Sequence, residues 1–216
     1  MRRIPRQERT TIPGCAGGLE TLVEEPAGES TDEPRLFGVV CHPHPLFGGT
    51  LENKVVHTLA RGLHELGLPT LRFNFRGVGA SAGSFADGIG ETEDALAVVA
   101  WGRARWPGAE PWLLGFSFGG AVAIRAAASA PARCLVTVAP AVERVATAAA
   151  MPTCPWLVIQ GDADEVIAPR SVLEWVARHA PDAVVRVLAG AGHYFHGRLP
   201  ELREAVVGFA RELGEP

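Results

Sequence analysis

Short runs of apolar residues alternate along the chain with segments whose apolar residues recur every three or four positions. The continuous runs, which predict strands, cover residues 37–41, 68–75, 112–116, 133–139, 156–160 and 184–188. The segments with helical spacing cover residues 53–66, 92–106, 121–130, 171–179 and 199–213. Strands that are apolar throughout are typical of a mainly parallel sheet buried on both faces. The pattern therefore predicts an α/β fold, a three-layer sandwich with helices on both faces of a central sheet.

The remaining sequence adds one strand and no second domain. Residues 19–25 predict a single edge strand before the alternation begins. The chain has 216 residues and contains no internal repeat, linker or low-complexity tract. We therefore expect residues 1–216 to form one domain with a large core.

Composition and charge narrow the classes of partner. The chain carries 20 basic and 24 acidic residues, and the net charge of −4 argues against nucleic acid or an anionic membrane as a partner. The N-terminal arginines are followed by no apolar segment of the secretory type, and no apolar run approaches the ~20 residues that span a bilayer. We expect a cytoplasmic protein, monomeric or homodimeric, with four reduced cysteines, Cys15, Cys41, Cys134 and Cys154.

A serine stands between a predicted strand and a predicted helix. Residues 115–119 read Gly-Phe-Ser-Phe-Gly and fit the G-x-S-x-G pattern of a nucleophile elbow. A tight strand-to-helix turn strains the backbone of Ser117, and a side chain two residues away on either side would collide with it. The hydroxyl would project above the sheet, at the positive end of a helix dipole. The alternative is that Ser117 only caps the helix.

Two later loops add an acid and a base. In open α/β sheets, functional groups gather at the carboxyl ends of the strands. The loop after residue 160 contains Asp162, Asp164 and Glu165, and the loop after residue 188 contains His193 and His196. A serine hydroxyl needs a base that removes its proton, and an imidazole needs a carboxylate that fixes its tautomer. These loops therefore predict a serine nucleophile with its acid and its base.

The order of these motifs resembles the α/β-hydrolase superfamily, and within it a small bacterial group without a lid. The resemblance runs from Leu36 to the C-terminus and includes HPHP-x-x-GG at residues 42–49 and F-R-G-x-G-x-S at residues 75–81. It implies a Ser-Asp-His catalytic triad. In the family pattern G-x-x-D-x-V, the acid matches Asp164, with Asp162 as the alternative. His193, which follows a glycine, matches the base, with His196 as the alternative.

The oxyanion of an acyl-transfer intermediate needs two preorganised N–H donors. The resemblance implies the amide of Phe118, directly after the nucleophile, as one donor. The second should come from residues 42–49, where Pro43 and Pro45 have no N–H, which leaves His44 and Leu46. The family motif there is H-G-x, and this chain has proline in place of the glycine.

Two motifs suggest cofactors that we do not expect. His42 and His44 could bind a metal, but the flanking prolines extend the chain, so the two rings should point to opposite faces, and no further ligand completes a site. Their expected role is to shape the loop and pack against Asn74 or Arg76. Residues 77–82 match a loose dinucleotide pattern, but no helix opens directly after them. Five tryptophans should lie in the core, Trp101, Trp106, Trp112, Trp156 and Trp175.

The chain leaves no room for a lid. Only residues 140–155 separate two predicted strands at the point where many α/β-hydrolases insert a cap domain. We therefore expect no cap domain and an open site that takes a small carboxylic ester. Its predicted walls are Leu46, Phe47, Phe116, Phe118, Val142 and Tyr194. The alternatives are a prolyl or aminoacyl peptidase or amidase, with Glu52, Asp87 or Glu91 binding the substrate amine, and a non-catalytic binding protein.

Overall fold

The computed structural model describes residues 6–26, 33–145 and 150–215. Within them, eight strands form one sheet in the order β1-β2-β4-β3-β5-β6-β7-β8. Their bounds are β1 Arg6–Gly14, β2 Gly17–Glu25, β3 Leu36–Cys41, β4 Thr70–Phe73, β5 Glu110–Phe116, β6 Cys134–Val138, β7 Trp156–Gly161 and β8 Val184–Leu188. From β4 to β8 every neighbouring pair is parallel. The predicted mainly parallel sheet is therefore confirmed.

The N-terminal edge of the sheet differs from the prediction. We expected one edge strand over residues 19–25, but β1 and β2 form an antiparallel hairpin in which Gly14 pairs with Gly17, and β2 joins β4 antiparallel. Strand β1 is missing from the prediction because most of its residues are exposed, and only Ile12 is buried. A strand that buries so little carries almost no apolar pattern.

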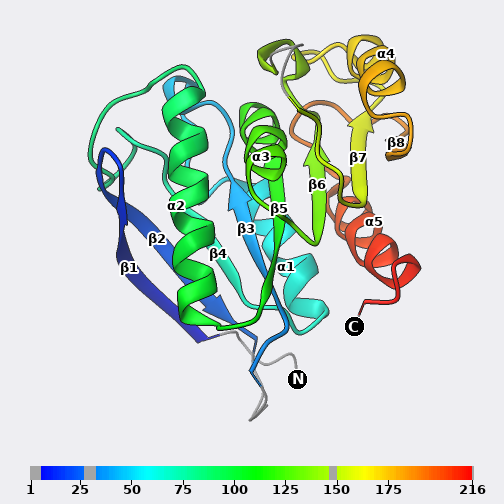
Figure 1. The fold of residues 1–216 in the computed structure, drawn as a ribbon. Helices are drawn as coiled ribbons and strands as arrows, with labels where there is room; N and C mark the ends of the chain where they lie inside the picture. The colour runs from blue at the N-terminus through cyan, green and yellow to red at the C-terminus, as the bar shows by residue number, and fades with distance from the viewer. Residues whose placement is uncertain (1–5, 27–32, 146–149, 216) are drawn as a thin grey trace.

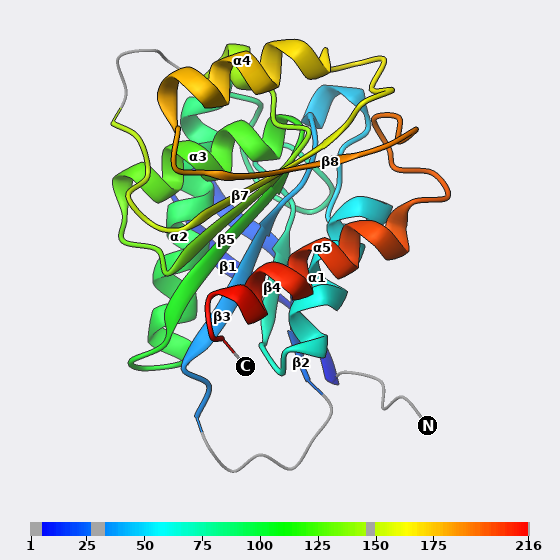
Figure 2. The ribbon, with the colours of Figure 1, turned by 90° about the vertical axis from the view of Figure 1, so that its right-hand side faces the viewer.

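Within the described residues, five α-helices cover the sheet. Two lie on one face and three on the other, as Figures 1 and 2 show from two sides. Helices α1 and α5 pack on one apolar cluster, and α2, α3 and α4 pack on the cluster of the opposite face. Their bounds are α1 Lys54–Glu65, α2 Ile89–Arg105, α3 Phe118–Ser129, α4 Pro169–His179 and α5 Leu199–Glu212. Two short 3-10 helices, η1 Pro45–Phe47 and η2 Val142–Arg144, lie in loops. The three-layer sandwich is confirmed.

Three helices begin before their predicted first residues. Helix α2 begins at Ile89 rather than 92, because the carboxylate of Glu91 accepts hydrogen bonds from the amides of Gly88 and Ala86 at 2.7 and 2.8 Å and caps the helix start. Helix α3 begins at Phe118 rather than 121, directly after the predicted nucleophile. Helix α4 begins at Pro169, a residue well suited to the first helical position.

The loops at the carboxyl ends of the parallel strands meet at one edge of the sheet, the upper edge in Figure 1. This edge holds the turn between β5 and α3, the loop after β3, and the loops after β7 and β8. No helix in the described part of the chain is long and apolar enough to cross a membrane. The described cysteines are all free thiols, and Cys41 and Cys134 are buried.

Candidate active site

Ser117 occupies a strained turn between β5 and α3. Its backbone has φ 56° and ψ −117°, a conformation that a residue with a side chain rarely adopts. Four backbone hydrogen bonds fix it. Its amide donates to Val138 at 2.9 Å, and its carbonyl accepts from Gly120 at 2.9 Å, Ala141 at 3.0 Å and Ala121 at 3.3 Å. The surrounding strand and loop therefore hold the strained residue in place.

The two glycines of the motif are needed for a reason that differs from the sequence-based one. A Cβ on Gly115 would stand 2.1 Å from the carbonyl oxygen of Gly119, and a Cβ on Gly119 would stand 2.4 Å from those of Cys41 and His42. The collisions are thus with backbone carbonyls rather than with Ser117. The glycines allow the elbow to pack against itself and against the end of β3.

The structure brings Ser117, His193 and Asp164 into one hydrogen-bonded chain. His193 Nε2 lies 3.1 Å from Ser117 Oγ, and His193 Nδ1 lies 2.9 Å from Asp164 Oδ2. All three residues are buried. An ionised carboxylate can only accept, so Nδ1–H donates to Asp164 and the lone pair of Nε2 faces the hydroxyl of Ser117. In this tautomer the imidazole can take the proton of the serine.

Both carboxylate oxygens of Asp164 are fully engaged. Oδ1 accepts from the amides of Val166 and Ile167 at 2.9 and 2.8 Å, and Oδ2 accepts from Gln160 Nε2 at 3.1 Å besides His193. Burial raises the pKa of Asp164, but the hydrogen bonds from His193, Ile167 and Val166 outweigh burial and hold this pKa below its usual value. Asp164 is therefore ionised at neutral pH.

His193 is held by a ring and by a second carboxylate. The Phe116 ring lies beneath it, with 4.9 Å between ring centroids. The backbone amide of His193 donates to Glu165 Oε2 at 3.2 Å. Sequence reasoning assigned no role to Gln160 or Glu165. Only their positions beside Asp164 in the sequence could have pointed to them.

The alternative acid and base lie outside this chain of hydrogen bonds. Asp162 is exposed and accepts from the amide of Gly190 at 2.6 Å, so it ties two loops together. His196 is exposed, and its ring lies 6.0 Å from that of Tyr194. The structure thus separates Asp164 from Asp162 and His193 from His196.

Two amides in the loop after β3 were expected as candidates for the second oxyanion donor, and the structure leaves one of them available. The amide of Leu46 donates to His44 Nδ1 at 3.3 Å, within its own loop. The amide of His44 donates to no acceptor within the described residues. The Phe118 amide is the first of α3 and has no carbonyl one turn earlier in the helix. His44 and Phe118 thus offer the available N–H groups.

Aromatic rings surround His44. Its ring lies 4.7 to 5.0 Å from those of Phe47, Phe85 and Phe118. The guanidinium carbon of Arg144 lies 5.6 Å from the centre of the Phe118 ring. Phe118 is buried in this cluster, so the prediction that its ring lines an open site is wrong. Phe47, in contrast, is 81% exposed. His44 therefore sits between the interior and the surface of the site.

Of the other predicted walls, Phe116 also differs from expectation. Phe116 is fully buried under His193, so the prediction that it lines an open pocket is wrong. Val142 is nearly buried but borders a hollow of about 380 Å³ that Val166, Ile167 and Trp175 also line. Tyr194 is exposed beside His193.

The histidine at the end of β3 packs differently from the prediction. His42 is fully buried and accepts, through Nε2, the amide of Phe75 at 3.0 Å, so its partner is neither Asn74 nor Arg76. Burial lowers the pKa of His42 to about 4, so the ring is neutral at pH 7. Arg76 instead pairs with buried Asp94 at 2.8 Å.

The other predicted motifs serve the fold in this structure. The turn at residues 77–82 packs against Glu20, whose carboxylate accepts from the amide of Ala80 at 2.9 Å. Within the described residues, no three His, Cys, Asp or Glu side chains are grouped as metal ligands. Of the five tryptophans, Trp106, Trp112 and Trp156 are buried, and Trp101 and Trp175 are half-buried.

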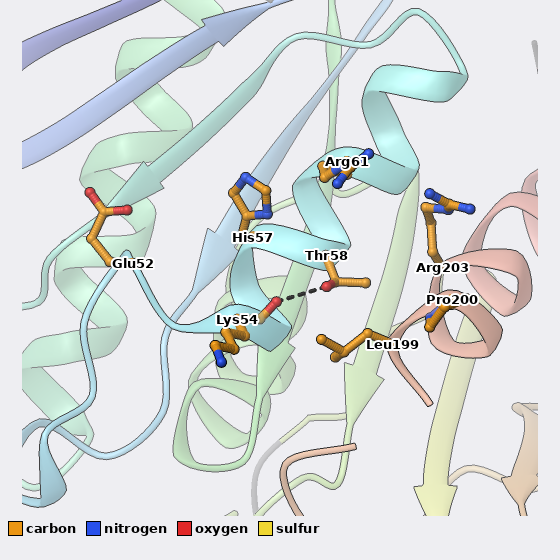
Figure 3. A pocket seen from close by; sticks show the side chains of 8 residues that line it. All are labelled: Glu52, Lys54, His57, Thr58, Arg61, Leu199, Pro200 and Arg203. Atoms are coloured by element: carbon orange, nitrogen blue, oxygen red, sulfur yellow. Dashed lines mark hydrogen bonds between the residues drawn. The ribbon is translucent and has the colours of Figure 1, made fainter. Parts of the chain in front are cut away.

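A separate hollow of about 270 Å³ lies between α1 and α5 (Figure 3). No member of the Ser117, His193 and Asp164 chain lines it. Arg203, on α5, pairs with Glu65 of α1 at 3.2 Å. Arg61 and Arg203 are shown on facing sides of the hollow in Figure 3. Its lining residues are Glu52, Lys54, His57, Thr58, Arg61, Leu199, Pro200 and Arg203.

Known proteins share this fold and much of the sequence. Residues 46–150 match the model of a family described as serine aminopeptidase S33. An α/β serine hydrolase homologue from Coxiella burnetii is 45% identical, with a TM-score of 0.87 over 94% of this chain and 96% of that one. A serine hydrolase without a lid from Xanthomonas campestris is 40% identical, with a TM-score of 0.90 over 96% of this chain and 95% of that one.

These matches identify the class of protein. The sheet order, the covering helices and the solved relatives define an α/β-hydrolase fold. An uncharacterised protein from Rickettsia prowazekii is 32% identical over 201 residues, which is 88% of this chain and 84% of that protein. The chain belongs to the α/β-hydrolase superfamily, among the α/β serine hydrolases without a lid.

Proposed function

We propose that this protein is a serine hydrolase that cleaves small carboxylic esters through an acyl-enzyme intermediate. The observation that carries the proposal is the unbroken contact from Ser117 Oγ through His193 to Asp164, with separations of 3.1 and 2.9 Å. These separations are within the range for a nucleophile, its general base and the group that orients the base. We further propose that it acts in the cytoplasm without a cofactor, as a monomer or homodimer.

In the first half of the reaction, Ser117 Oγ attacks the ester carbonyl carbon while its proton moves to His193 Nε2. Asp164 stays ionised and stabilises the imidazolium. The oxyanion that forms would lie against the amides of Phe118 and His44. When the intermediate collapses, the imidazolium gives its proton to the departing alkoxide, so an alcohol leaves and the acyl group remains on Ser117.

In the second half, a water molecule takes the place of the alcohol. His193 removes one proton from this water as its oxygen attacks the acyl carbon. The second intermediate collapses by expelling Ser117 Oγ, which takes back the proton from His193. The products are the carboxylic acid and the free enzyme.

The carboxylates near the site favour an ester over a substrate with a free amine. Both oxygens of Glu91 cap the start of α2, and Glu52 pairs with Arg9 and lies 3.6 Å from Arg72. Asp87 pairs with Arg144 at 3.0 Å. An aminopeptidase needs a carboxylate that is free to bind the substrate's ammonium group, and each of the three candidates is already engaged.

The open mouth of the site favours a small substrate. Phe47 and Tyr194 would contact it from loops on two sides, and the hollow beside Val142 would take a short apolar arm. That hollow, about 380 Å³, lies at the lower end of the range for small-molecule pockets. We therefore expect short acyl chains to be preferred.

Hydrolysis of p-nitrophenyl acetate by the wild type and by Ser117→Ala tests this proposal. We expect Ser117→Ala to lose a factor on the order of 10⁶ in kcat. The control Ser129→Ala, at an exposed serine at the far end of α3, should keep full activity. Equal rates in the wild type and Ser117→Ala would overturn it.

A fluorophosphonate probe separates a non-catalytic protein, which would not be labelled, from an enzyme with another substrate. Aminoacyl p-nitroanilides then compare amide with ester cleavage.

A further inference from the structure

Gln160 is a polar side chain buried behind the acid of the site. It is the next-to-last residue of β7, just before the loop that carries Asp164, and it is fully buried. The four residues before it in β7 are apolar or aromatic, as expected for a central strand. A glutamine at this depth must have a specific set of partners.

The surroundings fix which way the amide of Gln160 points. Its NH₂ group lies 3.1 Å from Asp164 Oδ2, 3.2 Å from the carbonyl oxygen of Gly161 and 3.5 Å from that of Ile167. All three neighbours are oxygen acceptors, so the nitrogen rather than the oxygen of the amide must face them.

This orientation leaves the other end of the amide without a partner. Gln160 Oε1 is buried and accepts no hydrogen bond from any residue in the described part of the chain. A buried polar atom without a partner destabilises a fold, and an apolar side chain of similar length would avoid that penalty. The unpartnered oxygen therefore costs stability, and what Gln160 supplies in return is the set of hydrogen bonds from Nε2, the shortest of them to Asp164.

The contact falls on the oxygen that binds the histidine. Asp164 Oδ2 receives both Gln160 Nε2 and His193 Nδ1, while Oδ1 is fully occupied by two backbone amides. Of the nearby titratable groups, His193 bonds Asp164 directly, Glu165 accepts the amide of His193, and Asp162 points to Gly190. Gln160 is thus the one neutral side chain that shares Oδ2 with the imidazole among the residues described.

We propose that Gln160 is a positioning residue. Its hydrogen bond reduces the negative charge on Asp164 Oδ2, so that His193 acts as a base at a lower pH than it would without Gln160. The proposal rests on the function proposed above. A neutral donor that binds Oδ2 weakens the hydrogen bond between Asp164 and His193, and an amide N–H does not itself transfer its proton to the carboxylate. The backbone amides of Val166 and Ile167 keep the carboxylate in place whether or not Gln160 is present.

The test replaces Gln160 by methionine, which has a similar length and no donor. The Nδ1 proton of His193 should resonate further downfield in Gln160→Met than in the wild type, because Oδ2 then accepts from the imidazole alone. In esterase assays, kcat/KM at about pH 7 should fall roughly two- to tenfold, and it should recover to near the wild-type value at about pH 9. The acid limb of the profile therefore moves to higher pH.

The neighbouring substitution Ile159→Val is the matched control. It removes one buried methylene group from the same strand, on the face away from Gln160. It should therefore lower Tm slightly and leave the Nδ1 proton resonance and the acid limb unchanged. A loss in Gln160→Met that is equal at all pH values, or an Nδ1 proton that stays in place or moves upfield, would overturn the proposal. The resonance needs no turnover, so it tests Gln160 even if the wild type proves inactive on esters.

Discussion

Ser117 and the two residues proposed as its catalytic partners, His193 and Asp164, are held in different ways. Ser117 is fixed by backbone: a strained turn, four main-chain hydrogen bonds and two glycines at which a Cβ would collide with carbonyl groups. His193 and Asp164 lie in loops after the last two strands. Two backbone amides bind Asp164 Oδ1, and the remaining contacts come from side chains, notably Gln160, Glu165 and each other. We refer to these parts as the elbow side and the loop side.

The difference indicates how each side should respond to mutation. Backbone strain on the elbow side is supported by β5, β6 and the end of β3, so a change there should disturb folding and activity together. On the loop side, single hydrogen bonds can be removed without moving a strand. A change there should alter activity far more than stability. The following predictions test this contrast, from the largest expected effect on activity to the smallest.

Among these predictions, the largest effect should come from Asp164→Asn on the loop side. The amide is nearly isosteric with the carboxylate, but it favours the wrong tautomer of His193, with a proton on Nε2 facing Ser117. We expect kcat for p-nitrophenyl acetate to fall about 10⁴-fold while the far-ultraviolet circular dichroism spectrum stays that of the wild type. A loss below tenfold would show that Asp164 does not orient the base.

The same variant has a pH signature in stability. Because hydrogen bonding holds the pKa of Asp164 below its ordinary value of 3.8, the ionised group stabilises the fold fully above that value. This contribution is lost as pH falls through the lowered pKa of the folded state. The Tm difference between the wild type and Asp164→Asn should therefore shrink below about pH 4, as measured by thermal melts. A pH-independent difference would contradict this account.

The next effect concerns the second oxyanion donor. His44 has φ −53°, which proline can adopt, so His44→Pro removes the N–H with little backbone strain. His44→Ala keeps the N–H and serves as the control for the lost ring. We expect kcat in His44→Pro to be about 10²- to 10³-fold below that in His44→Ala. Equal values in the two variants would assign the donor elsewhere in the loop.

A smaller loss of activity, with a clear loss of stability, is expected for Gly119→Ala on the elbow side. The new methyl group would meet two carbonyl oxygens at 2.4 Å, so α3 must shift relative to β3. We expect the free energy of unfolding to fall by about 1–3 kcal/mol, measured by urea denaturation, with a parallel loss of activity.

Gly62→Ala is the matched control for that change. Gly62 lies inside α1, and a Cβ there would have ordinary contacts of 3.5 Å with Val206. This substitution should raise the free energy of unfolding by about 0.5–1 kcal/mol and leave activity unchanged. If Gly119→Ala were as well tolerated as Gly62→Ala, the packing of the elbow would be looser than the structure indicates.

The smallest effect should come from Glu165, which is exposed and accepts one amide of the His193 loop. Glu165→Ala removes the acceptor, and we expect kcat to fall by less than about tenfold with unchanged Tm. Glu165→Gln keeps an acceptor oxygen and should stay close to the wild type. If Glu165→Gln lost as much activity as Glu165→Ala, the charge rather than the hydrogen bond would matter.

Much of the fold could be read from the sequence because its strands and helices carry strong patterns. The buried strands β3, β5, β6 and β7 are close to their predicted ranges, since central parallel strands are apolar along their length. The edge strand β8 also matches its predicted range, although none of its residues is buried. Strand β1 could not be predicted, because its exposed residues leave no apolar pattern and its pairing with β2 depends on the antiparallel register. Helix α2 begins early because a buried glutamate caps it, a contact that spacing alone does not show.

The sequence by itself determined the motif around Ser117, the choice of Asp164 and His193 as its expected partners, and the order of strands and helices that carries them. Motifs and hydrophobic periodicity involve residues that are close together in the sequence, so they can be recognised without the structure. Only the tertiary structure decided that Phe116 lies under His193, that the Leu46 amide is engaged and that Gln160 shares an oxygen with the imidazole. Those contacts depend on how separate loops meet at one edge of the sheet, and burial and hydrogen bonding at that edge exist only once the chain has folded.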